Sequence, residues 1–252
     1  MRGGPGADWR SPEPYGELLL ADRRAFAWEW LRRNATYRRH WMTRGEAAAE
    51  GPELFGLLGW VDPALSARVA RPIWSIDRDP HVLRARPAFC AAPAEDLFDV
   101  RSVAPFVSVE IDAKRREHWL MSDGRWAIRL DLFDGTLLGD PVLVEHRISG
   151  LQSAKPKQVA LRQFIVLAQN GGLPRSMMPK ENKAAQWILE LRVGDAVMAG
   201  ANQQEIARRL FGGAISPKRW RTENPSYRSR VQRLVKRANS LLGDPFAGPW
   251  FA

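Results

Sequence analysis

An apolar stripe runs along residues 224–242 when the side chains are placed about 100° apart, as in an α-helix. On the opposite side of the same segment, every charged side chain is basic. A helix that buries one face and presents guanidinium groups on the other is suited to bind a polyanion. A solvated charged face is the alternative, but such faces usually mix both signs. The apolar stripe consists of Val231, Leu234, Val235, Ala238 and Leu242, and the basic side of Arg230, Arg233, Lys236 and Arg237.

Helical spacing also predicts three helices before this one. Their ends carry proline or asparagine at the start and glycine pairs after the last turn, as helix ends commonly do. They span residues 156–169, 182–199 and 202–211, with Pro156 and Asn202 as starts and Gly171-Gly172 and Gly212-Gly213 as stops. The final helix is expected to begin at Pro225, capped by Asn224.

Residues 106–148 change to the alternating period of β-strands. Alternating or β-branched runs occupy residues 106–112, 125–133 and 142–146, and Asp-Gly turn dipeptides lie between them. This pattern predicts a small antiparallel meander that packs against helices. Residues 61–105 are interrupted by prolines and are expected to be an irregular connector.

Residues 9–60 are expected to be helical and rich in tryptophan. Their arginine pairs at 23–24, 32–33 and 38–39 could touch phosphates, but nearby acids such as Asp22 and Glu29 favour a structural role. Aromatic residues are more often core than a platform for bases, although tryptophan also marks protein interfaces. We expect this part to pack on the apolar side of the C-terminal helices. The residues expected to contact that part or a partner protein are Trp28, Trp30, Tyr37 and Trp41.

The chain is therefore expected to be an α+β protein in two parts. Residues 1–105 would form an N-terminal interaction domain with its connector, and residues 106–252 the β meander and a helical DNA-binding domain. Residues 1–150 carry 21 basic and 22 acidic side chains (net −1), and residues 151–252 carry 17 and 6 (net +11), which sum to the overall +10. One neutral and one basic half indicate divided roles.

The single cysteine, Cys90, allows no intrachain disulfide, which fits a reducing cytoplasm. The first residues lack the apolar core of a signal peptide, and no stretch approaches the roughly 20 apolar residues that cross a bilayer. We expect a soluble cytoplasmic protein, associated with the nucleoid and without a membrane partner.

Residues 202–212 have the pattern of the first helix of a helix-turn-helix unit. Ile206 and Leu210 lie four residues apart on one face, Ala207 is small enough for close helix packing, and Gly212 allows the chain to turn away. In such units the second helix enters the major groove of DNA. Thirteen residues, 212–224, separate the two helices here, where a short turn is usual. We expect Trp220 to anchor this extended turn while its cations reach phosphates.

The expected DNA contacts follow from this arrangement. Arg228 and Arg230 would lie near base edges, because they are close to the start of the second helix. The remaining cations would contact phosphates and fix the register on the duplex. These remaining residues are Arg208, Arg209, Lys218, Arg219, Arg221, Arg233, Lys236 and Arg237.

A resemblance to a known family adds to this interpretation. Residues 119–251 resemble the C-terminal domain of a proteobacterial family long listed as of unknown function and now understood as an extended-turn helix-turn-helix. Residues 7–84 resemble the short regulator-like domain that precedes it in some members. The motifs in residues 7–84 are more distinctive than the generic helix-turn-helix pattern of residues 202–212. The motifs of the first set include Arg129-Leu-Asp131, Trp187-Ile-Leu-Glu-Leu-Arg192, Gln204-Glu-Ile-Ala207 and Trp220-Arg221, and those of the second Ala7-Asp-Trp-Arg10, Trp28-Glu-Trp-Leu-Arg-Arg-Asn34 and Val61-Asp-Pro63.

Chains with both parts resemble FseA-type transcriptional activators, which switch on excision and conjugative transfer of integrative and conjugative elements. The resemblance implies that the basic face of the C-terminal domain binds promoter DNA and that its opposite face packs on the N-terminal domain. It implies one protein partner as well, an antiactivator that binds the N-terminal domain. RNA polymerase is a second candidate partner, and the sequence leaves open whether it is contacted directly. Antiactivator relatives keep only the C-terminal domain with an acidic surface, whereas this chain has both parts and a cationic final helix.

Three other function classes compete with a DNA-binding activator as the interpretation of this sequence. An enzyme is disfavoured, because His40, His81, His118 and His146 lack metal-site spacing, and no phosphate-binding loop motif is present. No cofactor, metal or catalytic residue is therefore expected. An RNA-binding module remains an alternative, because phosphate contacts alone do not distinguish RNA from duplex DNA. A protein-interaction regulator of the antiactivator type, with little DNA binding, is the other alternative.

Overall fold

The computed structural model describes residues 8–46, 50–88, 90–212 and 225–251. Helices and a sheet occupy different parts of it, so the predicted α+β class is confirmed. The α-helices are α1 (Arg23–Leu31), α2 (Ala35–Thr43), α3 (Ala67–Ala70), α4 (Leu151–Asn170), α5 (Ala184–Met198), α6 (Gln203–Phe211) and α7 (Pro225–Gly243). The 3-10 helices are η1 (Glu13–Leu20), η2 (Pro52–Phe55), η3 (Ala94–Asp96), η4 (Val100–Phe106) and η5 (Arg175–Met177). The strands are β1 (Leu83–Ala88), β2 (Leu97–Phe98), β3 (Val107–Ile111), β4 (Glu117–Ser122), β5 (Ala127–Leu132) and β6 (Val142–His146).

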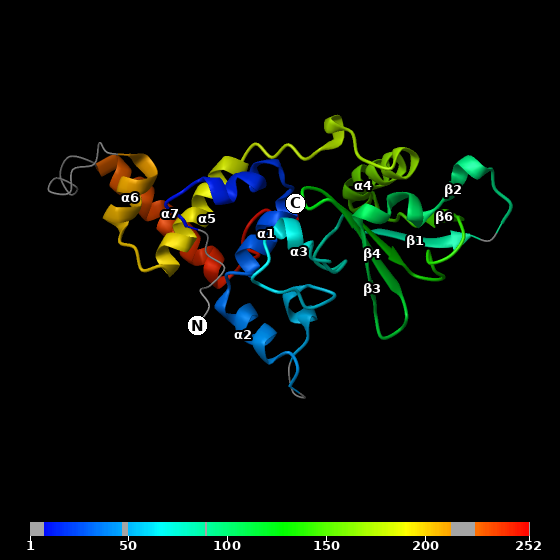
Figure 1. Cartoon of the computed structure of the whole chain (residues 1–252), viewed down its shortest axis with the longest axis horizontal. Helices are drawn as coiled ribbons and strands as arrows, with labels where there is room; N and C mark the ends of the chain where they lie inside the picture. The colour runs from blue at the N-terminus through cyan, green and yellow to red at the C-terminus, as the bar shows by residue number, and fades with distance from the viewer. Residues whose placement is uncertain (1–7, 47–49, 89, 213–224, 252) are drawn as a thin grey trace.

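The molecule is elongated (Figure 1). Helices α5, α6 and α7 lie at one end, the sheet and α4 lie at the other, and the N-terminal helices lie between them. Helices α1 and α2 begin at side-chain caps, because Asp22 accepts a hydrogen bond from the Ala25 amide (3.2 Å) and Asn34 from the Tyr37 amide (2.9 Å). Such caps satisfy amide groups that have no partner inside the first helical turn.

The six strands form one sheet in the order β2-β6-β1-β5-β4-β3. Strands β3, β4 and β5 form an antiparallel meander. The predicted meander comprised residues 106–112, 125–133 and 142–146, so it contained β3 and β5 but missed β4, and its third strand, β6, pairs with β1 and β2 instead. Strand β1, however, runs parallel to β5, with Leu83 opposite Leu130, so the sheet is mixed. The expectation of an irregular connector over residues 61–105 was wrong, because β1 and β2 come from it. Pro87 concealed β1, since proline is rare inside a sheet; in the structure it lies opposite Val144 of β6.

Helix α4 packs on the sheet and completes a hydrophobic core with it. Ala160, Phe164 and Leu167 project from α4 into this core, together with Leu130 of β5. The helix begins five residues before the predicted start at Pro156, after Gly150 as N-cap, so Pro156 lies within it. The proline removes one hydrogen bond of the helix without ending it. The helix ends as predicted at Gly171, whose φ of 64° is left-handed.

A second core joins the N-terminal helices to the C-terminal ones. Phe26 of α1 packs edge-on against Trp187 of α5, with ring centroids 5.1 Å apart, and it stacks near Trp250 at the end of the chain. Residues of α6 and α7 belong to the same buried cluster. This core positions the two C-terminal helices whose outer surface is described next.

Candidate nucleic-acid interface

Helices α6 and α7 pack against each other through small and apolar side chains. The Asn202 side chain caps α6 by accepting a hydrogen bond from the Glu205 amide (2.9 Å), which confirms the predicted start of this helix. Ile206 and Ala207 are buried, and α6 contacts α7 along this face. Residues 213–224 of the extended turn lie outside the described residues. The predictions for Trp220 and for the Asn224 cap, and the phosphate contacts predicted for Lys218, Arg219 and Arg221, therefore stay predictions.

The apolar stripe predicted for α7 is the buried face of that helix. Val231, Leu234 and Ala238 are buried in the core shared with the N-terminal helices, and Val235 is half-buried. At the C-terminal end of the stripe, Leu241 is fully buried, whereas the predicted Leu242 is only half-buried. The inner face of α7 is therefore fixed by packing, which orients its other face to the outside.

The outer face of α7 carries basic side chains that are exposed. Arg228, Arg230, Arg233 and Lys236 form no ion pair with any residue that the structure describes. The Arg230 guanidinium lies over the Phe211 ring, 4.5 Å from its centroid, and Arg233 donates a hydrogen bond to the Ser229 hydroxyl (3.2 Å). These contacts orient the two guanidinium groups, and no carboxylate among the described residues neutralises their charge.

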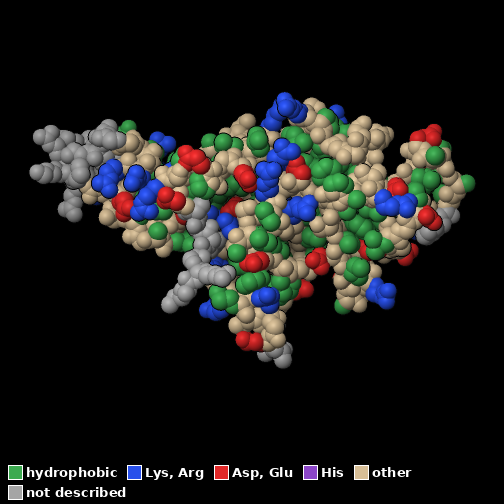
Figure 2. All heavy atoms as spheres, in the orientation of Figure 1, with side chains coloured by type: hydrophobic (Ala, Val, Ile, Leu, Met, Phe, Trp, Pro, Cys, Tyr) green, Lys and Arg blue, Asp and Glu red, His purple; other side chains and the backbone are tan. Residues whose placement is uncertain are grey.

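Arg208 and Arg209 extend this surface onto the last turn of α6. Both are exposed, and neither has an ion-pair partner within the described ranges. Figure 2 shows Lys and Arg side chains gathered at the end of the molecule that α6 and α7 form. We call the set Arg208, Arg209, Arg228, Arg230, Arg233 and Lys236 the α6–α7 basic surface.

Arg237 differs from the other cations of α7. It is half-buried, and its Nε lies 3.9 Å from Oε2 of Glu190 on α5. Its Nη2 donates a hydrogen bond to the Ala247 carbonyl (3.3 Å). The expectation that Arg237 is free to contact a phosphate therefore needs correction, because this side chain ties α7 to α5 and to the C-terminal segment.

Two acidic residues of α5 and α6 are bound to cations of the N-terminal segment. Glu205 of α6 pairs with Arg10 at 2.8 Å. Asp195 of α5 accepts two hydrogen bonds from Arg33, at 2.7 and 2.8 Å, and one from the Tyr15 hydroxyl at 2.6 Å. The N-terminal segment thus supplies the partners of these carboxylates, so they do not compensate the cations of α6 and α7.

The Arg33–Asp195 pair belongs to a buried ionic network between α1 and α5. Arg33 also binds Glu29, whose carboxylate accepts a hydrogen bond from the Ala67 amide (2.8 Å). Burial alone would lower the pKa of Arg33, but the charges of Asp195 and Glu29 outweigh burial and raise it. Burial and the charge of Asp195 raise the pKa of Tyr15, so its hydroxyl stays protonated. The structural role expected for the arginine pair at 32–33 is observed.

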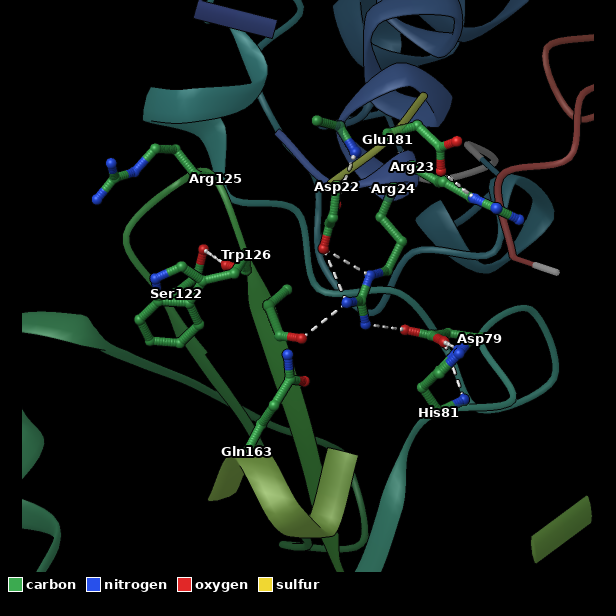
Figure 3. A network of polar contacts seen from close by, with 12 residues as sticks. Asp22, Arg23, Arg24, Asp79, His81, Ser122, Arg125, Trp126, Gln163 and Glu181 are labelled. Carbon is green, nitrogen blue, oxygen red and sulfur yellow. Dashed lines mark hydrogen bonds and ion pairs between the residues drawn. The ribbon is translucent and has the colours of Figure 1, made fainter. Parts of the chain in front are cut away.

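The pair at 23–24 is structural too, as Figure 3 shows. Arg24 donates to the carboxylates of Asp22 (3.0 Å) and Asp79 (3.1 Å) and to the Ala127 carbonyl of β5 (2.8 Å), and so joins α1 to the sheet. Burial would raise the pKa of Asp79, but Arg24 and His81 lower it well below its usual range. Arg23 pairs with Glu181 in the segment before α5.

The aromatic residues proposed as partner contacts lie mostly in the core. Trp28, Trp30 and Tyr37 are fully buried, so they cannot line an exposed surface. Trp30 does contact the C-terminal part, since a Cβ at Gly194 of α5 would come within 2.9 Å of its ring. Trp41 is half-buried under the Arg44 guanidinium, 4.1 Å from the ring centroid, next to an exposed Met42.

A polar groove of about 720 Å³ lies between the β3–β4 hairpin and residues 75–77. His118 lies in this groove between Asp131 (3.0 Å from Nδ1) and Asp112 (3.4 Å from Nε2). The hydrogen bond to Asp131 raises the pKa of His118, although burial opposes this, so the contacts with the two carboxylates favour the charged imidazole.

The residues that the structure describes contain neither a candidate metal centre nor a helix that could span a membrane. Among them, no three His, Cys, Asp or Glu side chains are grouped closely enough to hold a metal ion. No helix in this part of the chain is long and apolar enough to cross a bilayer.

Comparison with protein families gives two matches. Residues 8–56 match a family described as a proteobacterial transcriptional regulator-like domain. Residues 153–244, which include α5, α6, α7 and most of α4, match a family described as a T6SS transcription factor DNA-binding domain. A search among curated proteins finds no match. The two family matches support a DNA-binding transcriptional regulator.

Proposed function

We propose that this chain is a transcriptional activator that binds duplex DNA in a sequence-specific manner through the α6–α7 basic surface. The observation that carries the proposal is the division of α7 into two faces. Its apolar face is buried in the core, while Arg228, Arg230, Arg233 and Lys236 are exposed without a carboxylate partner among the described residues. A rigid helix with one cationic face fits the major groove in width and in charge.

Position along α7 suggests different roles for these cations. Arg228 and Arg230 lie within the first two turns, where recognition helices contact base edges. Arg233 and Lys236 follow further along the helix, and Arg208 and Arg209 flank it on α6; phosphates are their proposed partners. Lys218, Arg219 and Arg221, in the extended turn, are proposed as further phosphate contacts. Arg237 could join them only after leaving Glu190.

The activator role and its target rest on the resemblance to FseA-type regulators. We propose that the protein controls excision and conjugative transfer of a mobile element, and that an antiactivator or RNA polymerase binds its N-terminal part. The exposed surface around Trp41 and Met42 on α2 is the proposed contact, because Met42 is 65% exposed and Trp28, Trp30 and Tyr37 are buried. Residues 1–105 and 106–252 are the proposed regulatory and DNA-binding parts.

The test is a DNA-binding titration with the full chain and labelled duplexes from upstream regions of neighbouring excision and transfer genes. If six phosphate contacts form, the logarithm of affinity should fall with the logarithm of salt concentration with a slope of about −5. Replacing Arg230 and Arg233 by glutamine should weaken binding by at least about 5- to 150-fold, because the lost base contact of Arg230 alone costs about 1–3 kcal/mol and Arg233 loses a phosphate contact in addition.

The matched control replaces Arg86 and Arg101, which are exposed but paired with Glu145 (2.7 Å) and Asp99 (2.8 Å) near the sheet. It removes the same charge, and we expect it to bind nearly as the unaltered protein does. If both variants lost the same DNA affinity, binding would depend only on the net charge of the protein, which contradicts the proposed site. Competition with structured RNA tests the alternative partner. If the RNA displaced the labelled duplex at the same concentration as unlabelled duplex does, the proposal would be overturned.

A further inference from the structure

A second group of basic side chains begins on α4, at the sheet end of the molecule, and continues to the start of α5. Residues 151–183 form α4 and the segment that leads from it through η5 to α5. Six basic side chains occur in this stretch against one acidic residue, Glu181, whose carboxylate pairs with Arg23 of α1. We call the six the α4 basic surface: Lys155, Lys157, Arg162, Arg175, Lys180 and Lys183.

No acidic residue that the structure describes pairs with the α4 basic surface. Within the residues that the structure describes, none of the six side chains forms an ion pair or a side-chain hydrogen bond. Five of them are exposed and Lys157 is half-buried. On the sheet part, Arg86 and Arg101 each pair with a carboxylate, whereas the exposed Arg84, Arg115 and Arg147 have no ion-pair partner in the described ranges.

The packing of α4 aims part of this charge to the outside. Ala160, Phe164 and Leu167 face the sheet core. Lys155 and Arg162 lie seven residues apart, close to two full turns, and therefore share the opposite face of the helix. The Gln163 side chain donates a hydrogen bond to the Met177 carbonyl (3.4 Å), which holds η5 beside the middle of α4. Arg175 of η5 is therefore an exposed cation in a segment that lies beside α4.

We infer that the α4 basic surface is a second contact surface for duplex DNA, which binds the phosphate backbone at positions away from the α6–α7 site. The inference rests on the proposed function, because it takes DNA as the partner. Helix α4 and the α6–α7 helices lie at opposite ends of an elongated molecule (Figure 1), so cations on both would contact a longer stretch of duplex than one helix in one groove. The contacts would be independent of sequence, since they involve charge alone.

Charge favours DNA over an acidic protein as the occupant. From α4 to the start of α5 there are six cations and one acid, Glu181, whose charge is taken up by Arg23. A duplex offers about one negative charge every 1.7 Å to such a row of cations. The family described as a DNA-binding domain matches from residue 153, and so includes nearly all of α4. Leu151, Val159 and Ile165 are also exposed on α4 and would suit a protein partner; the experiment below separates the two.

The experiment measures binding of the full chain to a labelled duplex of about 40 base pairs, roughly four helical turns, over a range of salt concentrations. The test variant replaces Lys155, Arg162 and Arg175 by glutamine. Three lost phosphate contacts should reduce the magnitude of the log–log salt slope by about 2 to 3 and weaken binding at least tenfold at low salt. A charge-matched control replaces the paired residues Arg68, Arg86 and Arg101. Thermal unfolding should be the same in both variants, because all six positions are exposed.

The outcomes separate this inference from the proposed function. If the α4 variant has the same slope and affinity as the control while the Arg230 and Arg233 variant binds weakly, the second surface is refuted and the α6–α7 site stands. If only the α4 variant loses affinity, the second surface stands and the α6–α7 site fails. If the unaltered chain binds no duplex, both fail. A change in partner-protein binding without a change in DNA affinity also overturns the inference.

Discussion

Arg33 and Asp195 form a bidentate ion pair, with Nε–Oδ1 and Nη2–Oδ2 distances of 2.7 and 2.8 Å, although 162 residues separate them along the chain. Arg33 follows α1 and Asp195 lies on α5, so the pair connects the N-terminal helices to the helix on which α7 packs. Fork-to-carboxylate geometry of this kind fixes orientation as well as distance. The position of α7 thus depends on residues far from any predicted DNA contact.

Replacing Arg33 by methionine should lower the free energy of unfolding by about 3–5 kcal/mol, because Asp195 would stay buried without its ion pair and Glu29 would keep only Arg32. Urea denaturation of the full chain measures this loss. Arg39 offers the matched control, since it is exposed and has no ion-pair partner in the described ranges; its replacement by methionine should cost less than about 0.5 kcal/mol. Equal effects at the two positions would show that the buried network contributes nothing specific.

Gly194 lies in α5 where the Trp30 ring passes over the helix. A Cβ there would be 2.9 Å from one ring carbon and 3.1 Å from another, and Trp30 is fully buried with no room to move. Replacing Gly194 by valine should destabilise the protein by about 1–3 kcal/mol through overpacking. Ala185→Val places the same side chain on an exposed position of α5 and should cost only about 0.5 kcal/mol of helix propensity. A Gly194 variant as stable as this control would contradict the close contact.

His118 should make stability depend on pH. Its pKa is raised by the contact with Asp131, although burial opposes this, and Asp112 contacts the other ring nitrogen. A raised folded-state pKa means that the stabilisation is fully present below the unfolded-state value of about 6.5 and is lost as pH rises through the folded-state pKa. Melting temperatures between pH 6 and 9 should therefore fall in the unaltered chain. The fall should be smaller in His118→Gln; identical curves would exclude this role.

Local signals in the sequence predicted the local features of the structure. The Asn202 cap and the two faces of α7 were predicted from neighbouring residues, because helix ends and periodicity depend on a few positions. The start of α4 was missed, since Pro156 resembles a first-turn proline but lies within the helix. Strand β1 was missed for a related reason, because Pro87 interrupts its pattern.

Contacts between distant segments could not be predicted from one sequence. Nothing in the residues around Arg33 indicates Asp195 as its partner, and the pattern of α7 does not reveal that Glu190 lies beside Arg237. Burial of Trp28, Trp30 and Tyr37 was one of two interpretations that the sequence left open. Tertiary packing decided between them, since residues of α5 and α7 share the core with these rings.

Arg237 provides a test of how the fold tunes DNA binding, given the proposed function. Because Glu190 and the Ala247 carbonyl hold this side chain, Arg237→Gln should weaken binding to duplex DNA less than Arg233→Gln does. Glu190→Gln should strengthen binding about two- to fivefold at low salt, since it releases Arg237 from a partly exposed pair worth roughly 0.5–1 kcal/mol. Glu95→Gln removes an equal charge on η3, at the sheet end of the molecule, and serves as control. If the Glu190 and Glu95 variants bind alike, or Arg237→Gln costs as much as Arg233→Gln, then Glu190 does not restrain Arg237 and the full set of α7 cations acts on DNA.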